Sequence, residues 1–141
     1  ANPAHKNMKD IINSKIKKRE SFRPFAPSIL EDDVNKFFEC DIRSEFMNHI
    51  VKFKKEWCDV FPSVCHVDDT ARLQTVNKDN NPLFYQLISE LKKITGYGII
   101  LNTSFNENEP IVDTPEQAIN CFLRTDMDIL FLEKFMISKD S

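Results

Sequence analysis

Four segments of the chain carry apolar residues three and four positions apart, a spacing that predicts helices. They are residues 7–16, 31–39, 82–95 and 114–123. The third has the strongest signals, because Asn81 can cap its start, Pro82 suits its first turn and Gly96 can end it. We expect its apolar residues to form one stripe, made of Leu83, Leu87, Leu91 and Ile94.

The fourth helical segment opens on a capping box, in which the Thr114 hydroxyl and the Gln117 side chain satisfy backbone N–H groups of the first turn. Its inward face is predicted to consist of Ala118, Ile119, Phe122 and Leu123. The shorter second segment should present its apolar residues on one side, namely Val34, Phe37 and Phe38. In the first segment, Asn7 is a suitable N-cap.

Short apolar or alternating runs between these helices predict strands over residues 28–30, 46–53, 63–67, 72–76, 98–101 and 129–132. Two prolines, Pro24 and Pro27, keep the stretch before the first strand extended or turned. Strands and helices alternate in the second half of the chain. This alternation predicts an α/β fold with a mixed sheet that is at least partly parallel.

Composition and charge narrow the class of protein. The chain has 141 residues, of which 41% are hydrophobic, and this is enough for the packed core of one domain. Its net charge of −3 argues against general nucleic-acid binding through a basic surface. No run approaches the roughly 20 apolar residues that cross a bilayer, and the Lys-rich start lacks the apolar core of a signal peptide. We therefore expect a soluble, cytoplasmic protein without nucleic-acid or membrane partners.

The cysteines and glycines exclude several kinds of site. The four cysteines are Cys40, Cys58, Cys65 and Cys121. Their irregular spacing, without a CxxC pair, predicts free thiols rather than a zinc site or a disulfide scaffold. Because Gly96 and Gly98 are the only glycines, the common Gly-rich phosphate loops cannot be present.

The first 23 residues form a locally basic segment that would attract a phosphate-bearing ligand. Lys17 and Arg23 belong to it, and the rigid turn at Pro24 and Pro27 lowers the entropy cost of presenting the Arg23 guanidinium to a phosphate. The simpler alternative is a solvated helix face followed by a lysine-rich turn.

A second polar cluster runs from His66 to Gln74. His66 and Asp68 would share one face of an extended stretch, which suits a pair of metal ligands or an imidazole oriented by a carboxylate. The spacing of the histidines supplies no third ligand, so we expect no metal here. Arg72 and Gln74 would share a strand face and could reach the same anion as Arg23, whereas the alternative for Arg72 is an ordinary surface ion pair.

Small polar side chains follow the predicted strand at residues 98–101, and they are Asn102, Thr103, Ser104 and Asn106. Ligands of open α/β sheets bind outside the carboxyl ends of strands, where such side chains can contact phosphate, ribose or amide groups. A polar turn is the alternative. Neither Ser104 nor Cys121 has a neighbouring base in the sequence, so we predict no covalent nucleophile.

Four motifs in order along the chain carry a resemblance to a known family. They are residues 8–13 with 18–28 (MKDIIN and KRESFRPFAPS), residues 66–76 (HVDDTARLQTV), residues 101–106 (LNTSFN) and residues 109–112 (EPIV). Together they resemble the C-terminal region of the carbamoyltransferase family, which includes nodulation carbamoyltransferases and the O-carbamoyltransferases of antibiotic biosynthesis.

The resemblance implies one part of a two-part enzyme. In this family an N-terminal Kae1-like domain carries the metal and acceptor sites, and a C-terminal YrdC-like domain uses ATP, with Mg²⁺, to convert carbamoyl phosphate into carbamoyl-adenylate. The present chain resembles the second part only, a mixed twisted sheet with packed helices whose opening residues would lie upstream of Ala1. We therefore expect residues 1–141 to be one domain of a longer chain, without metal ligands and without the full transfer activity.

Carried over by position, the resemblance implies an anion-binding set of Lys17, Arg23, Arg72 and Ser104, with Asn102, Thr103 and Asn106 beside it. Secondary candidates are His66, Asp68, Thr70 and Gln74. The cations would relieve the repulsion between carbamoyl phosphate and ATP, and we expect them to gather around one positively charged cavity. Two alternatives stay open: an enzyme resembling threonylcarbamoyl-adenylate synthase, and a non-catalytic nucleotide-binding or interaction module.

Overall fold

The structure, a computed structural model, describes residues 1–139. The chain divides into two compact units. The first unit comprises residues 1–9 and 24–103, and the second comprises residues 10–23 and 104 onward. None of the helices between residues 1 and 139 combines the length and the apolar character that crossing a bilayer requires.

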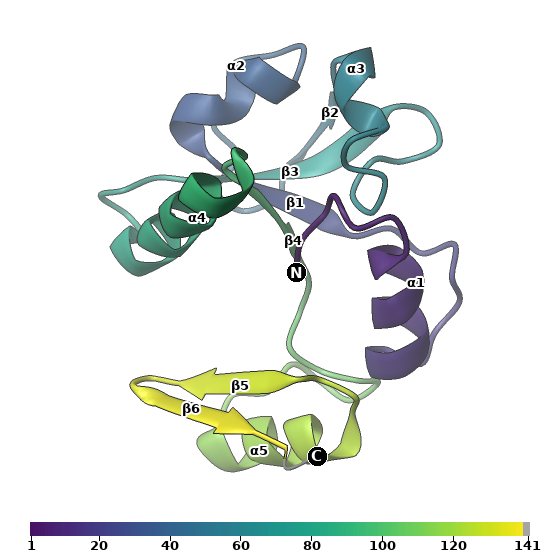
Figure 1. Ribbon diagram of the computed structural model, residues 1–141, viewed down its shortest axis with the longest axis vertical. Coiled ribbons are helices and arrows are strands. Elements are labelled where there is room, and N and C mark those ends of the chain that lie inside the picture. The colour runs from purple at the N-terminus through teal and green to yellow at the C-terminus, as the bar shows by residue number, and fades with distance from the viewer. Residues whose placement is uncertain (140–141) are drawn as a thin grey trace. The chain divides into compact units, whose positions relative to one another are not determined.

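A four-stranded mixed sheet forms the centre of the first unit (Figure 1). Its strands are β1 (Ala26–Leu30), β2 (His49–Lys52), β3 (Thr70–Val76) and β4 (Ile99–Asn102). They lie in the order β2-β3-β1-β4, in which β1 and β3 are parallel and the other two pairs are antiparallel. The α/β class and the partly parallel sheet are therefore confirmed.

The helices of the first unit are short, apart from one. They are the 3-10 helix η2 (Glu31–Asp33), α2 (Val34–Phe37), α3 (Lys55–Cys58) and α4 (Pro82–Thr95). The remaining predicted helix is α1 (Met8–Ile11), which continues as the π-helix η1 (Ile12–Ile16), and the boundary between the units falls within α1. The apolar residues predicted for the second helical segment are all buried: Val34, Phe37 and Phe38.

The two faces of the sheet differ in chemistry. Residues on one strand alternate between faces, and on one face Ile29, Leu73 and Leu101 are almost completely buried. The other face is apolar at one end, where Leu30 and Val76 pack against Ile88 of α4. Beyond that contact the same face becomes polar, which leaves a surface for ligand chemistry beside the core.

Helix α4 has the predicted boundaries but not the predicted inward face. Asn81 accepts a hydrogen bond from the Phe84 N–H, and Gly96 ends the helix in the left-handed conformation. Three residues of the predicted stripe point outward, since Leu83, Leu87 and Ile94 are 80%, 60% and 83% exposed, whereas Leu91 is half-buried. The helix buries Ile88 instead, with Phe84 and Tyr85 partly buried against the same cluster. Because α4 has apolar residues on both sides, spacing alone could not select the side that meets the sheet.

The second unit contains α5 (Pro115–Arg124) and an antiparallel hairpin of β5 (Ile129–Leu132) and β6 (Phe135–Ser138). The Thr114 hydroxyl accepts the Gln117 N–H at 3.2 Å, which confirms this half of the predicted capping box, whereas the Gln117 side chain accepts the N–H of Asp113, before the helix, at 3.0 Å. The inward face of α5 is only partly as predicted. Ala118 and Phe122 are buried together with Cys121, but Ile119 and Leu123 are exposed, at 36% and 63%, so the prediction is wrong for these two.

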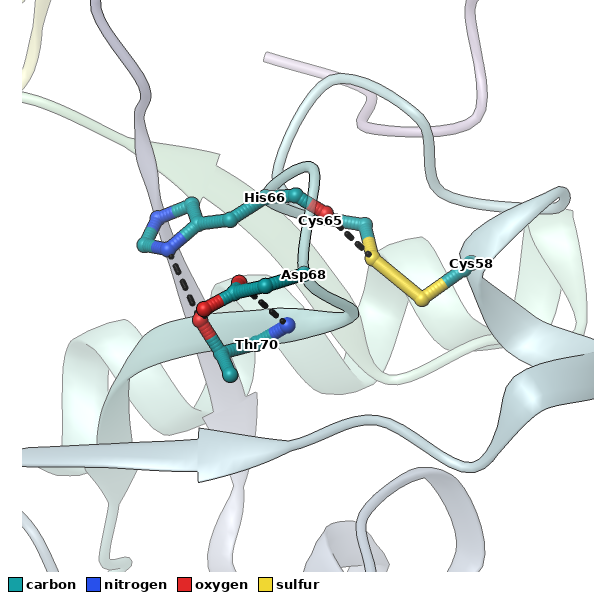
Figure 2. The surroundings of a disulfide bond; sticks show 5 residues. All are labelled: Cys58, Cys65, His66, Asp68 and Thr70. Atoms are coloured by element: carbon teal, nitrogen blue, oxygen red, sulfur yellow. Dashed lines mark hydrogen bonds between the residues drawn. A yellow bond between two sulfur atoms is a disulfide. The ribbon is translucent and has the colours of Figure 1, made fainter.

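Residues 58–66 contradict two predictions. Cys58 and Cys65 form a disulfide across a Cα–Cα distance of 5.5 Å (Figure 2), so the prediction of four free thiols is wrong for this pair and correct for Cys40 and Cys121. Residues 63–67 form turns rather than a strand. The cause is local, because Cys65 donates its N–H to the Phe61 carbonyl and folds the chain back toward the end of α3.

Candidate functional site

Lys17 is the most deeply buried charged side chain among the predicted site residues, with 2% of its surface exposed. Its ammonium group lies 2.6 Å from the Ser104 carbonyl oxygen and 3.1 Å from the Ser104 hydroxyl. It also lies 2.9 Å from the Asn106 carbonyl oxygen and 2.6 Å from Asn106 Oδ1. An ammonium has three protons, so these four acceptors share them, and Lys17 fixes the shape of the loop at Ser104–Asn106.

Burial sets the electrostatics of this lysine. Loss of solvation lowers the pKa of Lys17 below its usual range, and the neighbouring charge of Arg19 lowers it further. Both effects disfavour the charged form, whereas the four oxygens around the ammonium favour it. A ligand oxygen that reached Lys17 would therefore replace one of these contacts rather than meet an unused proton.

Arg23 lies at the end of a segment that Asn13 holds in place. Asn13 is completely buried, and its side-chain amide donates to the carbonyl oxygens of Ser21, at 3.3 Å, and Arg23, at 3.0 Å. Its Oδ1 accepts from Arg19 Nε at 2.7 Å. The Arg23 side chain itself is exposed and forms no salt bridge among residues 1–139. Sequence reasoning missed Asn13, because an Asn within a helical pattern gives no sign that it holds a distant turn.

In the first unit, the polar half of the sheet carries three further predicted residues, Arg72, Gln74 and Asn102. Arg72 and Gln74 alternate with buried neighbours on β3, which confirms that they share a face. Gln74 lies beside Ser28 of β1, and its Oε1 accepts from the Ser28 hydroxyl and, at 2.8 Å, from Asn102 Nδ2. A row of hydrogen-bonding groups therefore crosses β3, β1 and β4.

A hollow of about 450 Å³ lies beside this row in the first unit. Its lining residues are Glu45, Phe46, Gln74, Thr75, Val76, Asn77, Asn80 and Asn81. Glu45 accepts from Gln74 Nε2 through its backbone oxygen and from Asn80 Nδ2 through its carboxylate, at 3.2 and 2.8 Å. Glu45 and Asn80 were not predicted, because they belong to loops without a recognisable motif.

His66, Asp68 and Thr70 form a closed hydrogen-bonded turn at the start of β3 (Figure 2). The Thr70 hydroxyl donates to Asp68 at 2.6 Å, so its oxygen is left to accept from His66 Nδ1 at 3.1 Å. Burial lowers the pKa of His66, while the nearby Asp68 carboxylate acts in the opposite direction. The Thr70 hydrogen bond also lowers the pKa of Asp68. These contacts hold the turn that leads into β3, and a role of His66, Asp68 and Thr70 toward a ligand stays a prediction.

One further cluster has the composition of a metal site. Ligand atoms of Cys58, Cys65 and Asp69 lie within 4.8 Å of one another. Both sulfurs are already bonded to each other, and thiolates rather than disulfides bind metals. The two cysteines of this cluster therefore form a disulfide that links α3 to the turn before β3, and we assign no metal to the cluster.

Comparison with known proteins identifies the family that these motifs resemble. The family model described as carbamoyltransferase C-terminus matches residues 1–139. The chain belongs to the carbamoyltransferase C-terminus family.

Relatives in this family extend well beyond the matched region. Nodulation protein NolNO of Sinorhizobium fredii shares 48% sequence identity with this chain. The alignment covers 99% of this chain and 21% of that protein. Nodulation protein NolO of Bradyrhizobium diazoefficiens shares 46% identity with this chain, and the alignment covers 99% of this chain and 26% of NolO. An uncharacterized protein of Synechocystis is 40% identical to 97% of the chain, again covering 26% of the relative. The chain thus spans about a quarter of the length of these relatives.

The carbamoyltransferase C-terminal chain distributes its predicted site residues over both units. The second unit contains Lys17, Arg23, Ser104 and Asn106. Within it, Lys17 is in direct contact with Ser104 and Asn106. Arg72, Asn102 and Thr103 belong to the first unit, together with the secondary candidates His66, Asp68, Thr70 and Gln74. The gathering of all these residues around one ligand stays a prediction.

Proposed function

We propose that this chain is the part of an O-carbamoyltransferase that binds ATP, with Mg²⁺, and carbamoyl phosphate, and that forms carbamoyl-adenylate. The observation that carries the proposal is the contact of buried Lys17 with Ser104 and Asn106, three residues that the family resemblance assigns to ligand binding. Ser104 and Asn106 lie 87 and 89 positions after Lys17 along the chain, and the fold brings both to its ammonium group. A stabilising role alone does not require a lysine, because burying its charge is costly.

The chemistry requires positive charge and hydrogen-bond donors around two anionic substrates. Water first hydrolyses carbamoyl phosphate to carbamate and inorganic phosphate. A carbamate oxygen then attacks the α-phosphorus of ATP, and the bond from that phosphorus to the pyrophosphate oxygen breaks, so the products are carbamoyl-adenylate, pyrophosphate and inorganic phosphate. Lys17, Arg23 and Arg72 offset the repulsion between the substrates and the charge that develops on phosphoryl oxygens. Ser104, Asn102, Thr103 and Asn106 orient the phosphates or the carbamoyl amide, which is positioning rather than covalent catalysis.

The complete reaction also needs parts that this chain does not supply. The transfer of the carbamoyl group to a hydroxyl acceptor is assigned to a Kae1-like domain of the longer protein, which would hold the metal and the acceptor. We place the reaction in the cytoplasm and give nucleic acid no role in it. Because the chain spans about a quarter of its relatives, a module that binds nucleotide without catalysis is the second candidate.

Calorimetry and a pyrophosphate assay distinguish the two candidates. Mg–ATP and carbamoyl phosphate are titrated into the chain, and pyrophosphate release is followed with both present. We expect heat from each ligand, and Arg23→Ala and Arg72→Ala should each weaken binding about ten- to a hundredfold, as the loss of a charge-assisted contact does. Arg43→Ala is the matched control, since Arg43 is exposed and its ion pair within residues 1–139 is with Glu31.

Heat with pyrophosphate release supports the enzyme, and heat without release supports the binding module. Unchanged affinity in both arginine variants, or no heat with either ligand, contradicts the anion-binding assignment.

A further inference from the structure

The side-chain amide of Gln74 is fixed by three contacts. Its Nε2 donates to the Glu45 carbonyl oxygen at 3.2 Å, while its Oε1 accepts from the Ser28 hydroxyl and from Asn102 Nδ2. A carbonyl oxygen cannot donate a proton, so the contact with Glu45 decides which end of the Gln74 amide is nitrogen. Its oxygen must therefore face Ser28 and Asn102.

This orientation determines that of Asn102 in turn. Because Gln74 presents an oxygen, Asn102 must present its NH₂ group to it, at 2.8 Å. Asn102 Oδ1 then points away from Gln74, and within residues 1–139 it receives no hydrogen bond. The side chain is half-buried at the end of β4, on the polar half of the sheet face. Asn102 thus offers one acceptor oxygen in a fixed direction.

The Arg72 guanidinium belongs to the same face of the sheet as Gln74. Arg72 lies two residues before Gln74 on β3, and its side chain is exposed. A guanidinium binds phosphate oxygens, and an amide oxygen accepts an N–H. The face therefore suits a ligand that carries both a phosphate and a neutral N–H donor.

We propose that Gln74 is a positioning residue that holds the Asn102 oxygen outward to accept an N–H of the phosphate-bearing ligand. This inference rests on the proposed function and adds a role that the motifs do not supply. Two groups offer the required N–H: the carbamoyl NH₂ of carbamoyl phosphate, and the exocyclic amine of the adenine of ATP. The chemistry recognised is the same in both cases.

Matched ligand pairs test the proposal and tell the two sources apart. Acetyl phosphate replaces the carbamoyl NH₂ by a methyl group, and purine riboside triphosphate replaces the adenine amine by a hydrogen atom. The wild-type chain should bind one natural ligand at least about fivefold more tightly than its partner lacking the N–H, as expected for one hydrogen bond. A preference confined to the first pair identifies the carbamoyl group, and one confined to the second pair identifies adenine.

Two variants examine the role of Gln74. Gln74→Met keeps the length of the side chain but frees Asn102 to rotate, and Asn102→Ala removes the acceptor. Both should reduce the preference to near one, while affinity for the analogue without the N–H changes little. Asn80→Ala is the matched control, because Asn80 is another amide that bonds Glu45 but, among residues 1–139, forms no hydrogen bond with Gln74. It should keep the wild-type preference.

Discrimination, rather than stability, is the deciding measurement. A purely structural role for Gln74 would weaken both members of a ligand pair equally, and that result would overturn the proposal. If Gln74→Met does not fold, an unchanged preference in Asn102→Ala overturns it as well. Wild-type chain that binds neither ATP nor carbamoyl phosphate would contradict the proposed function itself, whereas binding without any preference would contradict only the role of the Asn102 oxygen.

Discussion

The carboxylate of Asp33 occupies the space in which any residue other than glycine at position 98 would place its Cβ. A Cβ on Gly98 would lie 2.3 Å from Asp33 Oδ2 and 2.9 Å from Leu30 Cδ1. Asp33 is buried, its Oδ1 binds Lys92 at 2.8 Å, and its Oδ2 has no hydrogen-bond partner among the described residues. The close approach of position 98, just before β4, to Asp33 and Leu30 thus depends on glycine.

Gly98→Ala should therefore destabilise the first unit by about 1–3 kcal/mol, the usual cost of overpacking a well-packed core. Urea unfolding of the variant and the wild type measures the difference. In an Asp33→Ala background the same substitution should cost less, because the nearest obstacle is gone. Equal costs in the two backgrounds would show that the carboxylate is not what excludes a side chain at position 98.

The element pattern of this chain was largely predictable, whereas the choice of packing faces was not. The caps at Asn81 and Thr114 act within one turn, so local sequence identifies them. Helix α4, however, carries apolar residues on two sides, and the sheet residues Leu30 and Val76 decide which side is buried. Leu30 lies far from α4 along the chain, so the periodicity of the helix gives no information about this contact.

The same limit applies to the site. Local composition indicated Lys17 and Ser104 separately, and their contact became visible only in three dimensions. The disulfide between Cys58 and Cys65 was missed because the turn after α3, rather than a recognisable cysteine spacing, brings the sulfurs together. The register of β1, β3 and β4 likewise places Ser28 beside Gln74.

Removing the ammonium group of Lys17 should loosen the loop at Ser104–Asn106. In Lys17→Met two backbone oxygens lose a charged donor, so we expect a loss of about 1.5–3 kcal/mol in stability. Hydrogen exchange should rise in the second unit around residue 106 and stay unchanged in β1 and β3 of the first. Lys15→Ala is the control, since Lys15 is exposed two residues earlier. Unaltered exchange in the loop would mean that Lys17 does not hold it.

Reduction of the disulfide should lower the stability of the first unit. Cys58 and Cys65 are seven residues apart, and the loop-entropy relation assigns such a short loop about 2–3 kcal/mol. Urea unfolding with and without a thiol reductant measures the loss. The double variant Cys58→Ser with Cys65→Ser should be insensitive to the reductant. A wild-type chain that unfolds at the same urea concentration in both conditions would contradict a contribution from this bond.

Mild acid should weaken the turn that begins β3. Burial lowers the pKa of His66 in the folded chain below the value of about 6.5 that the unfolded chain has. The unfolded state then binds more protons between these two values, so stability falls as the pH drops through 6.5 toward the folded pKa. Unfolding measured from pH 7.5 to pH 5 should show this loss, and His66→Gln should remove part of the slope. His49→Gln, a substitution in β2 outside this turn, is the matched control. Equal slopes in wild type and His66→Gln would show that His66 does not couple protonation to folding.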